Sequence, residues 1–409
     1  MLKTTSERKS LLVIFSVFTL IATTTICIVL YAQGYRLKFS RSLPQIQTRG
    51  LLSATSDPKS ASVYIDNLLS SATDSVIELT PGHYQVRIVK DGYQSWEKTV
   101  TISQEIVTQT NTVLFRSTPE IKPVSPDGIE IAKISPNLSQ VIYSVASASA
   151  RPLHHLYQLQ LLDSPLSLFT SQIRLLFTPP KLFTDWSQTE LEFSPDSKEI
   201  LLSIKKPYSH YLFPLNQTTS SQNTQDITTQ IPSIKKSWQT IVYNDIQSNL
   251  SLLPIEFRSI IATDSGFLKP NHDSTKFFYR ADYDSLLPIF PTSIPTSPSS
   301  PDLQTRQLLT GHYYIYDQTT DTNYHLGPNT DYAQIFWLPD TNYLVYSQTL
   351  PSGEVQIFSI DHDLTNRLLL FAGKLDPYIL APFTGGKKIL CLATLYSGSK
   401  PTLYSLTIR

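Results

Sequence analysis

The sequence contains little cysteine and little charge. Only two cysteines occur among 409 residues, Cys27 and Cys391, and they lie far apart in the chain. They cannot build a disulfide framework or a cysteine-based zinc site. Charged residues make up 16% of the chain, and the 33 basic residues balance the 33 acidic ones. This balance argues against a polyanionic partner such as nucleic acid.

Three motifs of common enzymes are also missing. The sequence has no Gly-x-Ser-x-Gly nucleophile elbow, no Gly-x-x-x-x-Gly-Lys-Ser/Thr phosphate loop and no Gly-x-Gly-x-x-Gly dinucleotide motif. The enzyme classes that depend on these motifs are therefore excluded. We expect no catalytic residue, no cofactor and no metal ion, and we predict that the protein is not an enzyme.

A few polar residues are candidates for chemistry. His154 and His155 are neighbours in a predicted strand, so they point to opposite faces and cannot bind one metal ion together. Residues Asp361, His362 and Asp363 are predicted to form a polar hairpin turn, with a surface metal site as the alternative. Asp196 could be a catalytic carboxylate, but it recurs in a repeated turn, which favours a role as a turn cap.

The N-terminal part is strongly apolar. The run Leu11–Ala32, LLVIFSVFTLIATTTICIVLYA, spans a ~30 Å hydrocarbon core at ~1.5 Å per residue, so it predicts an uncleaved transmembrane helix after a short tail, 1–10. The hydroxyls of Thr23, Thr24 and Thr25 can bond the carbonyl one turn back. A cleaved signal peptide is the alternative, but a small residue is missing three places before a cut after Ala32.

The orientation of this helix does not follow from its flanking charges. Basic residues lie on both sides of it, so the positive-inside rule gives no decision. We predict the N-terminus inside the cell and everything after Tyr35 outside, because of the domains that follow.

Residues 80–102 predict a β-hairpin. Tyr84, Val86 and Ile88 alternate with polar residues, and the alternation resumes at Trp96 after Asp91-Gly92. Gly92 is expected to have the positive φ that a tight turn needs. His83, next to Pro81 and Gly82, is expected to be a solvated strand residue without a chemical role.

Behind a stalk at 33–49, residues 50–116 resemble a PEGA domain, a small bacterial β-sandwich. The resemblance is carried by the strand ASVYIDN, by the hairpin LTPGHYQVRIVKDGY with Pro81, Gly82 and Gly92, and by the Trp96 strand. It implies a domain that often lies just outside a membrane anchor and has no known catalytic residues.

From residue 118 to the end, a proline-turn motif recurs. Its copies are ISPNLSQVIYSV, FSPDSKEILLSI, LKPNHDSTKFFYRA, WLPDTNYLVYSQ and APFTGGKKILCLAT, with turn residues Pro136, Pro195, Asp196, Pro270, Pro339 and Pro382. Proline fixes φ, and Asn or Asp closes the turn before a strand re-enters the core. Repeated small sheets of this kind close into a propeller.

These copies resemble the hairpins of TolB-like and WD40-like propellers. The resemblance implies a mostly β protein with a β-propeller of five to seven blades over 118–409. Two polar stretches, at about 215–236 and 284–310, are predicted to be loops with too little apolar content to pack.

The predicted function is that of a single-pass, membrane-anchored extracytoplasmic scaffold or binding protein. Its partners would be the membrane and a cell-envelope protein or glycan, which aromatic residues on one propeller face would recognise. The alternatives are a structural spacer without a dedicated ligand and a propeller enzyme acting on envelope glycans or peptides.

Overall fold

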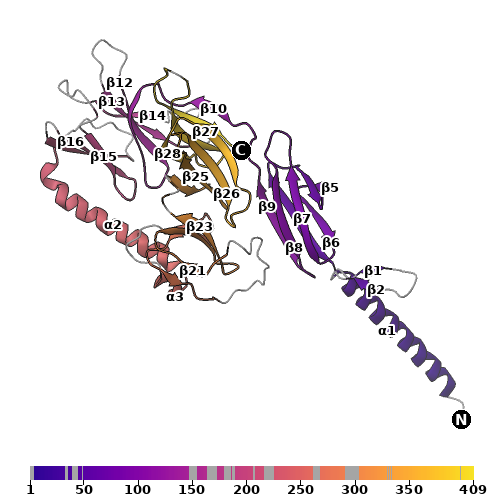
Figure 1. Ribbon diagram of the computed structural model, residues 1–409. Coiled ribbons are helices and arrows are strands. Elements are labelled where there is room, and N and C mark those ends of the chain that lie inside the picture. Colours follow the sequence, from indigo (N-terminus) through magenta and orange to yellow (C-terminus); the bar gives the residue numbers. More distant parts are fainter. Residues whose placement is uncertain are drawn as a thin grey trace. The chain divides into compact units, whose positions relative to one another are not determined.

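The computed structural model describes residues 4–32, 36–38, 45–47, 49–146, 154–163, 173–178, 186, 189–205, 208–215, 225–260, 268–290, 304–328, 330, 332, 334–396 and 398–409 (Figure 1). The chain divides into two compact units. The first comprises Met1–Asp91 and Ser95–Leu114, and the second comprises Gly92–Gln94 and Phe115–Arg409.

The N-terminal helix α1 (Thr4–Ala32) covers the apolar run. Its threonine hydroxyls donate hydrogen bonds one turn back, as expected; the bond from Thr23 to the Thr19 carbonyl is 2.7 Å long. Within the part of the chain that the structure describes, no helix combines the length and the apolarity needed to cross a membrane. In the predicted stalk, β1 (Arg36–Lys38) pairs antiparallel with β2 (Gln45–Gln47).

Two sheets form the body of the first unit, in the strand orders β6-β3-β9 and β5-β4-β7-β8. Their strands are β3 (Gly50–Asp57), β4 (Ser62–Ile65), β5 (Leu68–Ala72), β6 (Ser75–Leu79), β7 (Gly82–Val89), β8 (Trp96–Ile102) and β9 (Val107–Val113). The predicted hairpin is confirmed, because β7 pairs antiparallel with β8 from Gly82–Ile102 to Ile88–Trp96. Val86, Ile88 and Trp96 are buried, as the alternation predicts.

The described part of the second unit contains five larger sheets. Sheet I is β11 (Ile129–Ile134), β12 (Gln140–Ala146), β13 (His154–Gln160) and β14 (Ile173–Phe177); sheet II is β15 (Thr189–Phe193), β16 (Glu199–Lys205) and β17 (Tyr208–Pro214). Sheet III is β18 (Leu268–Pro270), β19 (Lys276–Arg280), β22 (His312–Asp317) and β23 (Thr322–Pro328). Sheet IV is β24 (Gln334–Trp337), β25 (Tyr343–Thr349), β26 (Val355–Asp361) and β27 (Leu368–Gly373). Sheet V has the order β10 (Glu120–Pro123), β30 (Thr402–Thr407), β29 (Lys388–Ala393) and β28 (Leu375–Pro382).

Neighbouring sheets pack through apolar faces. Sheet I shares one buried cluster with sheet V and another with sheet II. Sheet III packs on sheet IV through residues such as Phe278 and Leu344. Strand β10, from the start of the unit, pairs with β30 from its end and joins Glu120 to Thr407. The prediction of a mostly β chain with a PEGA region followed by a propeller-like fold is thus confirmed.

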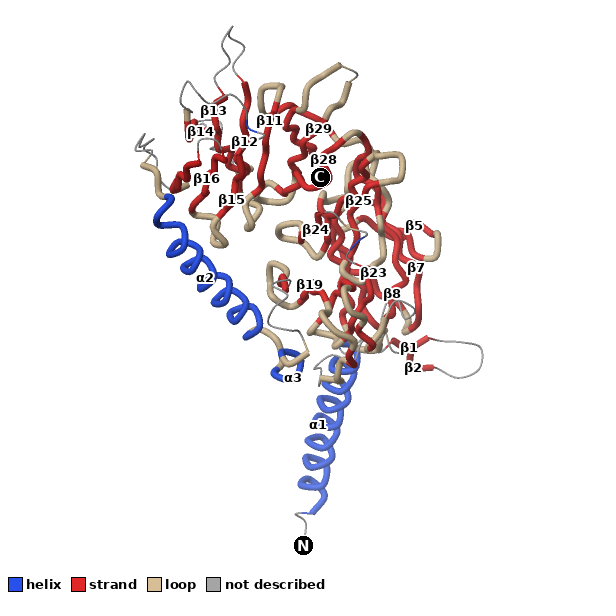
Figure 2. The backbone as a smooth tube through the Cα atoms, turned by 60° about the vertical axis from the view of Figure 1, so that its left-hand side comes forward, coloured by secondary structure: helices blue, strands red, loops and turns tan. Residues whose placement is uncertain are grey.

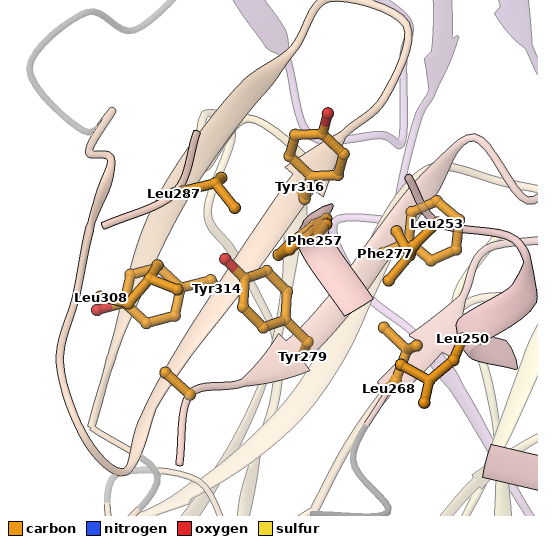
Figure 3. Packing of buried hydrophobic residues seen from close by; sticks show 11 residues of the cluster. Leu250, Leu253, Phe257, Leu268, Phe277, Tyr279, Leu287, Leu308, Tyr314 and Tyr316 are labelled. Carbon is orange, nitrogen blue, oxygen red and sulfur yellow. The ribbon is translucent and has the colours of Figure 1, made fainter. Parts of the chain in front are cut away.

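Helical elements lie between sheets II and III. They are the 3-10 helix η3 (Thr228–Gln230), α2 (Ile231–Ser251) and α3 (Ile255–Arg258). Figure 2 shows α2 running from sheet II towards α3. Lys235 of α2 forms an ion pair with Glu192 of sheet II, and Leu250 joins Phe257 of α3 in a buried cluster with sheet III (Figure 3). Helix α2 therefore bridges these two sheets.

This arrangement corrects the prediction of two polar loops. The stretch 215–236 runs into η3 and α2, and the stretch 284–310 contains the short pair β20 (Ser285–Leu286) and β21 (Gln307–Leu308). Both stretches supply buried residues, including Leu215, Leu287 and Leu308. Their central parts, 216–224 and 291–303, lie outside the described residues.

Candidate functional site

The proline turns connect paired neighbouring strands at one end of the second unit: β11 to β12, β15 to β16, β18 to β19, β24 to β25 and β28 to β29. In each copy a residue donates its N–H to a carbonyl five positions on, for example Ser194 to Glu199 at 2.9 Å. Pro136, Pro195 and Pro339 follow this donor directly, whereas Pro270 precedes its donor Asn271 and ends β18. The prolines are therefore not equivalent in all copies, although the turns are.

Asp196 lies inside its turn. Its Oδ1 accepts hydrogen bonds from the Ser194 hydroxyl at 2.7 Å and from the Lys198 N–H at 3.3 Å, and its Oδ2 lies 3.1 Å from the Lys198 Nζ. Partial burial acts to raise the pKa of Asp196, but these hydrogen bonds and the Lys198 charge bring the pKa below its ordinary value. All of these contacts serve the turn itself.

Turns of neighbouring sheets contact one another. Gln140 of sheet I donates to the Ser197 carbonyl of sheet II at 2.7 Å, and Asn271 of sheet III donates to Asn342 of sheet IV at 2.8 Å. A Cβ on Gly386 of sheet V would lie 2.7 Å from the Pro339 carbonyl oxygen of sheet IV. Residues in the turns therefore connect sheet I to sheet II and sheet III to sheet IV by hydrogen bonds, and the turn of sheet V packs closely on that of sheet IV.

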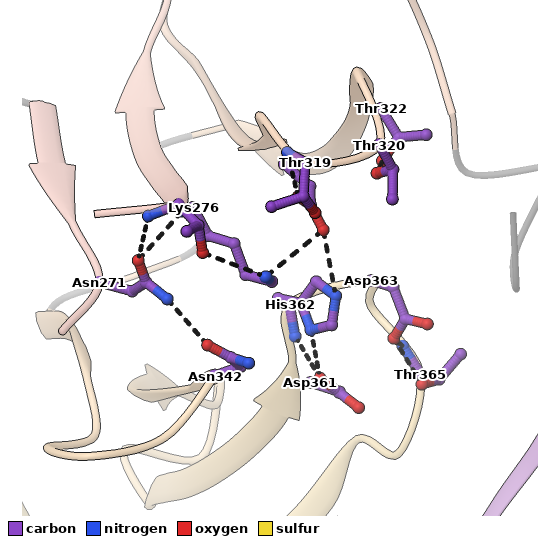
Figure 4. A network of polar contacts seen from close by, with 12 residues as sticks. Asn271, Lys276, Thr319, Thr320, Thr322, Asn342, Asp361, His362, Asp363 and Thr365 are labelled. Carbon is purple, nitrogen blue, oxygen red and sulfur yellow. Dashed lines mark hydrogen bonds and ion pairs between the residues drawn. The ribbon is translucent and has the colours of Figure 1, made fainter. Parts of the chain in front are cut away.

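A buried polar network extends this connection between sheets III and IV (Figure 4). Asp317 lies at the end of β22. Its Oδ2 is 3.5 Å from the Nζ of Lys276, in β19, and 3.7 Å from the Nε2 of His362, in sheet IV. The other ring nitrogen of His362, Nδ1, lies 2.6 Å from Asp361 Oδ1. Asp363 Oδ1 accepts the Thr365 hydroxyl at 2.6 Å. One imidazole thus connects carboxylates of two sheets.

The network combines buried carboxylates with one lysine and one histidine. Asp317, Asp361 and Asp363 are buried, and Lys276 brings one positive charge to them. A proton on His362 would let both ring nitrogens donate to carboxylates. Among the described residues, Asp361, His362 and Asp363 are also the group whose ligand atoms, within 4.8 Å of one another, could hold a metal ion. The contacts that connect the two sheets are those of the His362 ring, with Nε2 near Asp317 of sheet III and Nδ1 near Asp361 of sheet IV.

Sequence reasoning found part of this network. It placed Asp361, His362 and Asp363 in a hairpin turn; Asp361 is the last residue of β26, and His362 and Asp363 lie between β26 and β27. The alternative of a surface metal site does not fit Asp361 and Asp363, because both are buried. Sequence reasoning missed Lys276 and Asp317, which the pairing of β19 with β22 brings together and the packing of sheet III on sheet IV brings beside His362.

The candidates in the predicted hairpin, residues 80–102, have structural roles. Gly92 has a φ of 80°, as predicted for the turn. His83 is exposed, with its Nδ1 3.0 Å from the Thr101 hydroxyl; Pro81 directly precedes β7 and Gly82 begins it. In the second unit, His155 lies in the predicted strand, 3.2 Å from the Thr178 hydroxyl, and the side chain of His154 lies outside the described part.

Comparison with known proteins identifies the class of the first unit. The PEGA domain family model matches residues 49–118, so the predicted resemblance is confirmed and this segment is a PEGA domain. The sequence gives no match among curated proteins.

Solved structures similar to the chain include β-propellers. TolB from Acinetobacter baumannii is 12% identical over 79% of this chain, with a TM-score of 0.22, and this chain spans 59% of TolB. The RRP9 WD40 repeats are 9% identical over 72% of this chain and 99% of theirs, with a TM-score of 0.27. The β-propeller domain of the Trilobed protease from Pyrococcus furiosus is 12% identical over 80% of this chain and 92% of its own, with a TM-score of 0.23.

Proposed function

We propose that the protein is a single-pass, membrane-anchored scaffold whose PEGA domain and propeller-like unit lie outside the cytoplasm. In this proposal the second unit binds an envelope protein or glycan and catalyses no reaction. The N-terminus lies inside the cell, and no cofactor takes part.

The apolar run Leu11–Ala32 supports the membrane anchor. Where α1 side chains are described, over 14–29, large residues such as Ile14, Phe18 and Ile28 are more than half exposed. The hydroxyls of Thr23, Thr24 and Thr25 are satisfied by carbonyls of the same helix. A bilayer accommodates such a surface, because it offers apolar contact and requires internal hydrogen bonding.

Exposed tyrosines carry the binding part of the proposal. Tyr208, the first residue of β17 in sheet II, is 69% exposed, and Tyr396, between β29 and β30 of sheet V, is 74% exposed. Successive antiparallel connections alternate between the two ends of a sheet, so both tyrosines lie at the end opposite the proline turns. A tyrosine ring offers an apolar face and a hydroxyl, which suits a glycan or a peptide.

The polar clusters support a binding role rather than catalysis. Asp196 serves its own turn, and His362 connects two sheets, so the two strongest candidates for chemistry among the described residues already have structural partners.

The test is a pull-down from solubilised envelope with residues 50–409. Binding at this end would be supported if the unmodified protein captures one protein or glycan and the Tyr208→Ala and Tyr396→Ala variants do not. The control is Tyr243→Ala, which should still capture it, because Tyr243 is exposed on α2. Capture of nothing would favour the spacer. Extraction of the full chain by high salt without detergent would contradict the anchor.

A further inference from the structure

Two histidines of sheet III face each other outside the network described above. His312 begins β22 and His325 lies in β23, and the Nδ1 of His312 is 2.7 Å from the Nε2 of His325. The ring planes differ by 20° and the ring centroids are 5.0 Å apart. Nearly coplanar rings with this spacing direct one nitrogen of each ring at the other. One proton is shared between them, because two N–H groups could not face each other at this distance.

The surroundings fix the backbone of His312 and pack against the ring of His325. The main-chain N–H of His312 donates to the Leu309 carbonyl at 3.1 Å, and the main-chain carbonyl of His312 accepts from the Ala281 N–H at 3.0 Å. The ring of Tyr314 lies 5.1 Å from that of His325, at 29°. Both histidines are only partly buried, so solutes in the solvent reach them.

The electrostatic environment favours neutral imidazoles and positive ions. Burial and the neighbouring His312 lower the pKa of His325. Hydrogen bonds from Thr310 lower the pKa of Asp284, with His312 contributing, so this carboxylate stays ionised close to the pair. Neutral imidazole is the form that binds transition metals.

We propose that His312 and His325 form a binding site for a divalent transition-metal ion of the Zn²⁺, Ni²⁺ or Cu²⁺ class. The ion takes the position of the shared proton and bonds to one nitrogen of each ring; the proton moves, through solvent, to the other nitrogen of the ring that carried it, so both rings stay neutral. Metal–nitrogen bonds of about 2.0–2.1 Å require the two nitrogens to move to about 3–4 Å apart. Water completes the coordination, and the Asp284 carboxylate adds negative charge nearby. Imidazole ligands select these metals over Mg²⁺ and Ca²⁺, which prefer oxygen.

The test is calorimetric titration of the untagged, detergent-purified full chain with NiCl₂ and with ZnCl₂. We expect one ion per chain at pH 7.5 and an affinity at least tenfold lower at pH 5.5, because protons compete for the ligands. His312→Gln and His325→Gln should each weaken binding at least tenfold.

Two control variants separate this site from the other histidines. His362→Gln and His83→Ala should bind the ion as the unmodified chain does, and circular dichroism checks that each variant is folded. Binding that is lost in His362→Gln would assign the ion to Asp361, His362 and Asp363 and overturn the proposal. Binding unaffected by both His312→Gln and His325→Gln, or no binding at millimolar metal, would also overturn it.

Discussion

Single residues already show which features of this chain are structural. Gly92 stands out, because its φ of 80° falls in the left-handed region and no atom lies within 4 Å of the place where a Cβ would be. Steric clash with neighbours therefore plays no part there, and backbone conformation alone determines which residues the position tolerates.

We predict that Gly92→Val lowers the free energy of unfolding by roughly 1–2 kcal/mol, because a β-branched residue is strained at positive φ. His83→Ala, at an exposed position of the same hairpin, should change it by less than about 0.5 kcal/mol. Urea denaturation of both variants measures the difference. Equal stability of Gly92→Val and the unmodified chain would show that the turn can adopt another conformation.

His325 gives the stability a defined pH dependence. Its pKa is lowered on folding, by burial first and by His312 second, so folding favours the neutral ring. Its contribution is fully present above the unfolded pKa of about 6.5 and is lost as the pH falls through that value towards the folded pKa.

In metal-free buffer, unfolding at pH 7.5 and pH 5.5 should therefore show a smaller loss of stability on acidification for His325→Gln than for the unmodified chain. His155→Gln is the matched control, since it replaces a partly buried strand histidine elsewhere. The same pH dependence in His325→Gln and the unmodified chain would contradict the prediction.

Among the secondary-structure elements, α3 is short but central to a core. Phe257 is fully buried, with its ring centroid 4.7 Å from that of Tyr316 and 5.3 Å from that of Tyr279. Ile255, two positions earlier in the same helix, is 71% exposed. Phe257 therefore fixes α3, and through it the end of α2, to sheet III.

Phe257→Ala should lower the free energy of unfolding of the second unit by about 3–5 kcal/mol, since it leaves a cavity among rigid rings. Ile255→Ala should cost less than about 0.5 kcal/mol. Chemical denaturation followed by tyrosine and tryptophan fluorescence compares them. Similar values for the two variants would mean that α3 is not packed on sheet III.

The elements differ in how far sequence could predict them. The β7–β8 hairpin was predictable because alternation and turn chemistry are local. Helix α2 also carried a local signal, with Ile234, Trp238, Val242, Ile246 and Leu250 at helical spacing after Pro232, but the polar stretch before it obscured this pattern. The network of Lys276, Asp317 and His362 was not predictable, because its members come from three segments that only sheet pairing and packing bring together.

For the chain as a whole, the pairing of β10 with β30 decides how it responds to a cut. A cut between 291 and 303, in the proline- and serine-rich stretch, would leave β10 on one fragment and β30 on the other. Helices α2 and α3 would stay on the first fragment and pack on strand β22 of the second.

We predict that a site-specific protease site inserted at 291–303 yields two fragments that co-elute in size-exclusion chromatography without denaturant and separate in urea. The control is a second protease site between β1 and β2. A cut there releases a fragment that carries only α1 and β1 and leaves the second unit uncut. In spheroplasts, external protease should reach the inserted site without lysis. Protection until lysis would contradict the extracytoplasmic orientation, and separation without urea would contradict closure by β10.

The same pairing determines when folding can finish. A ribosome makes β10 before the rest of the second unit and β30 after almost all of it, so the partner of Glu120 does not exist until Thr407 has been synthesised. Until then, β10 has an open edge, and open strand edges promote aggregation. Contacts between such distant positions also form slowly. In a nascent chain this edge of β10 would therefore lack its partner until the last strand is made, and a chain that stalls just before β30 would contain nearly all of the second unit without the pairing that joins its start to its end.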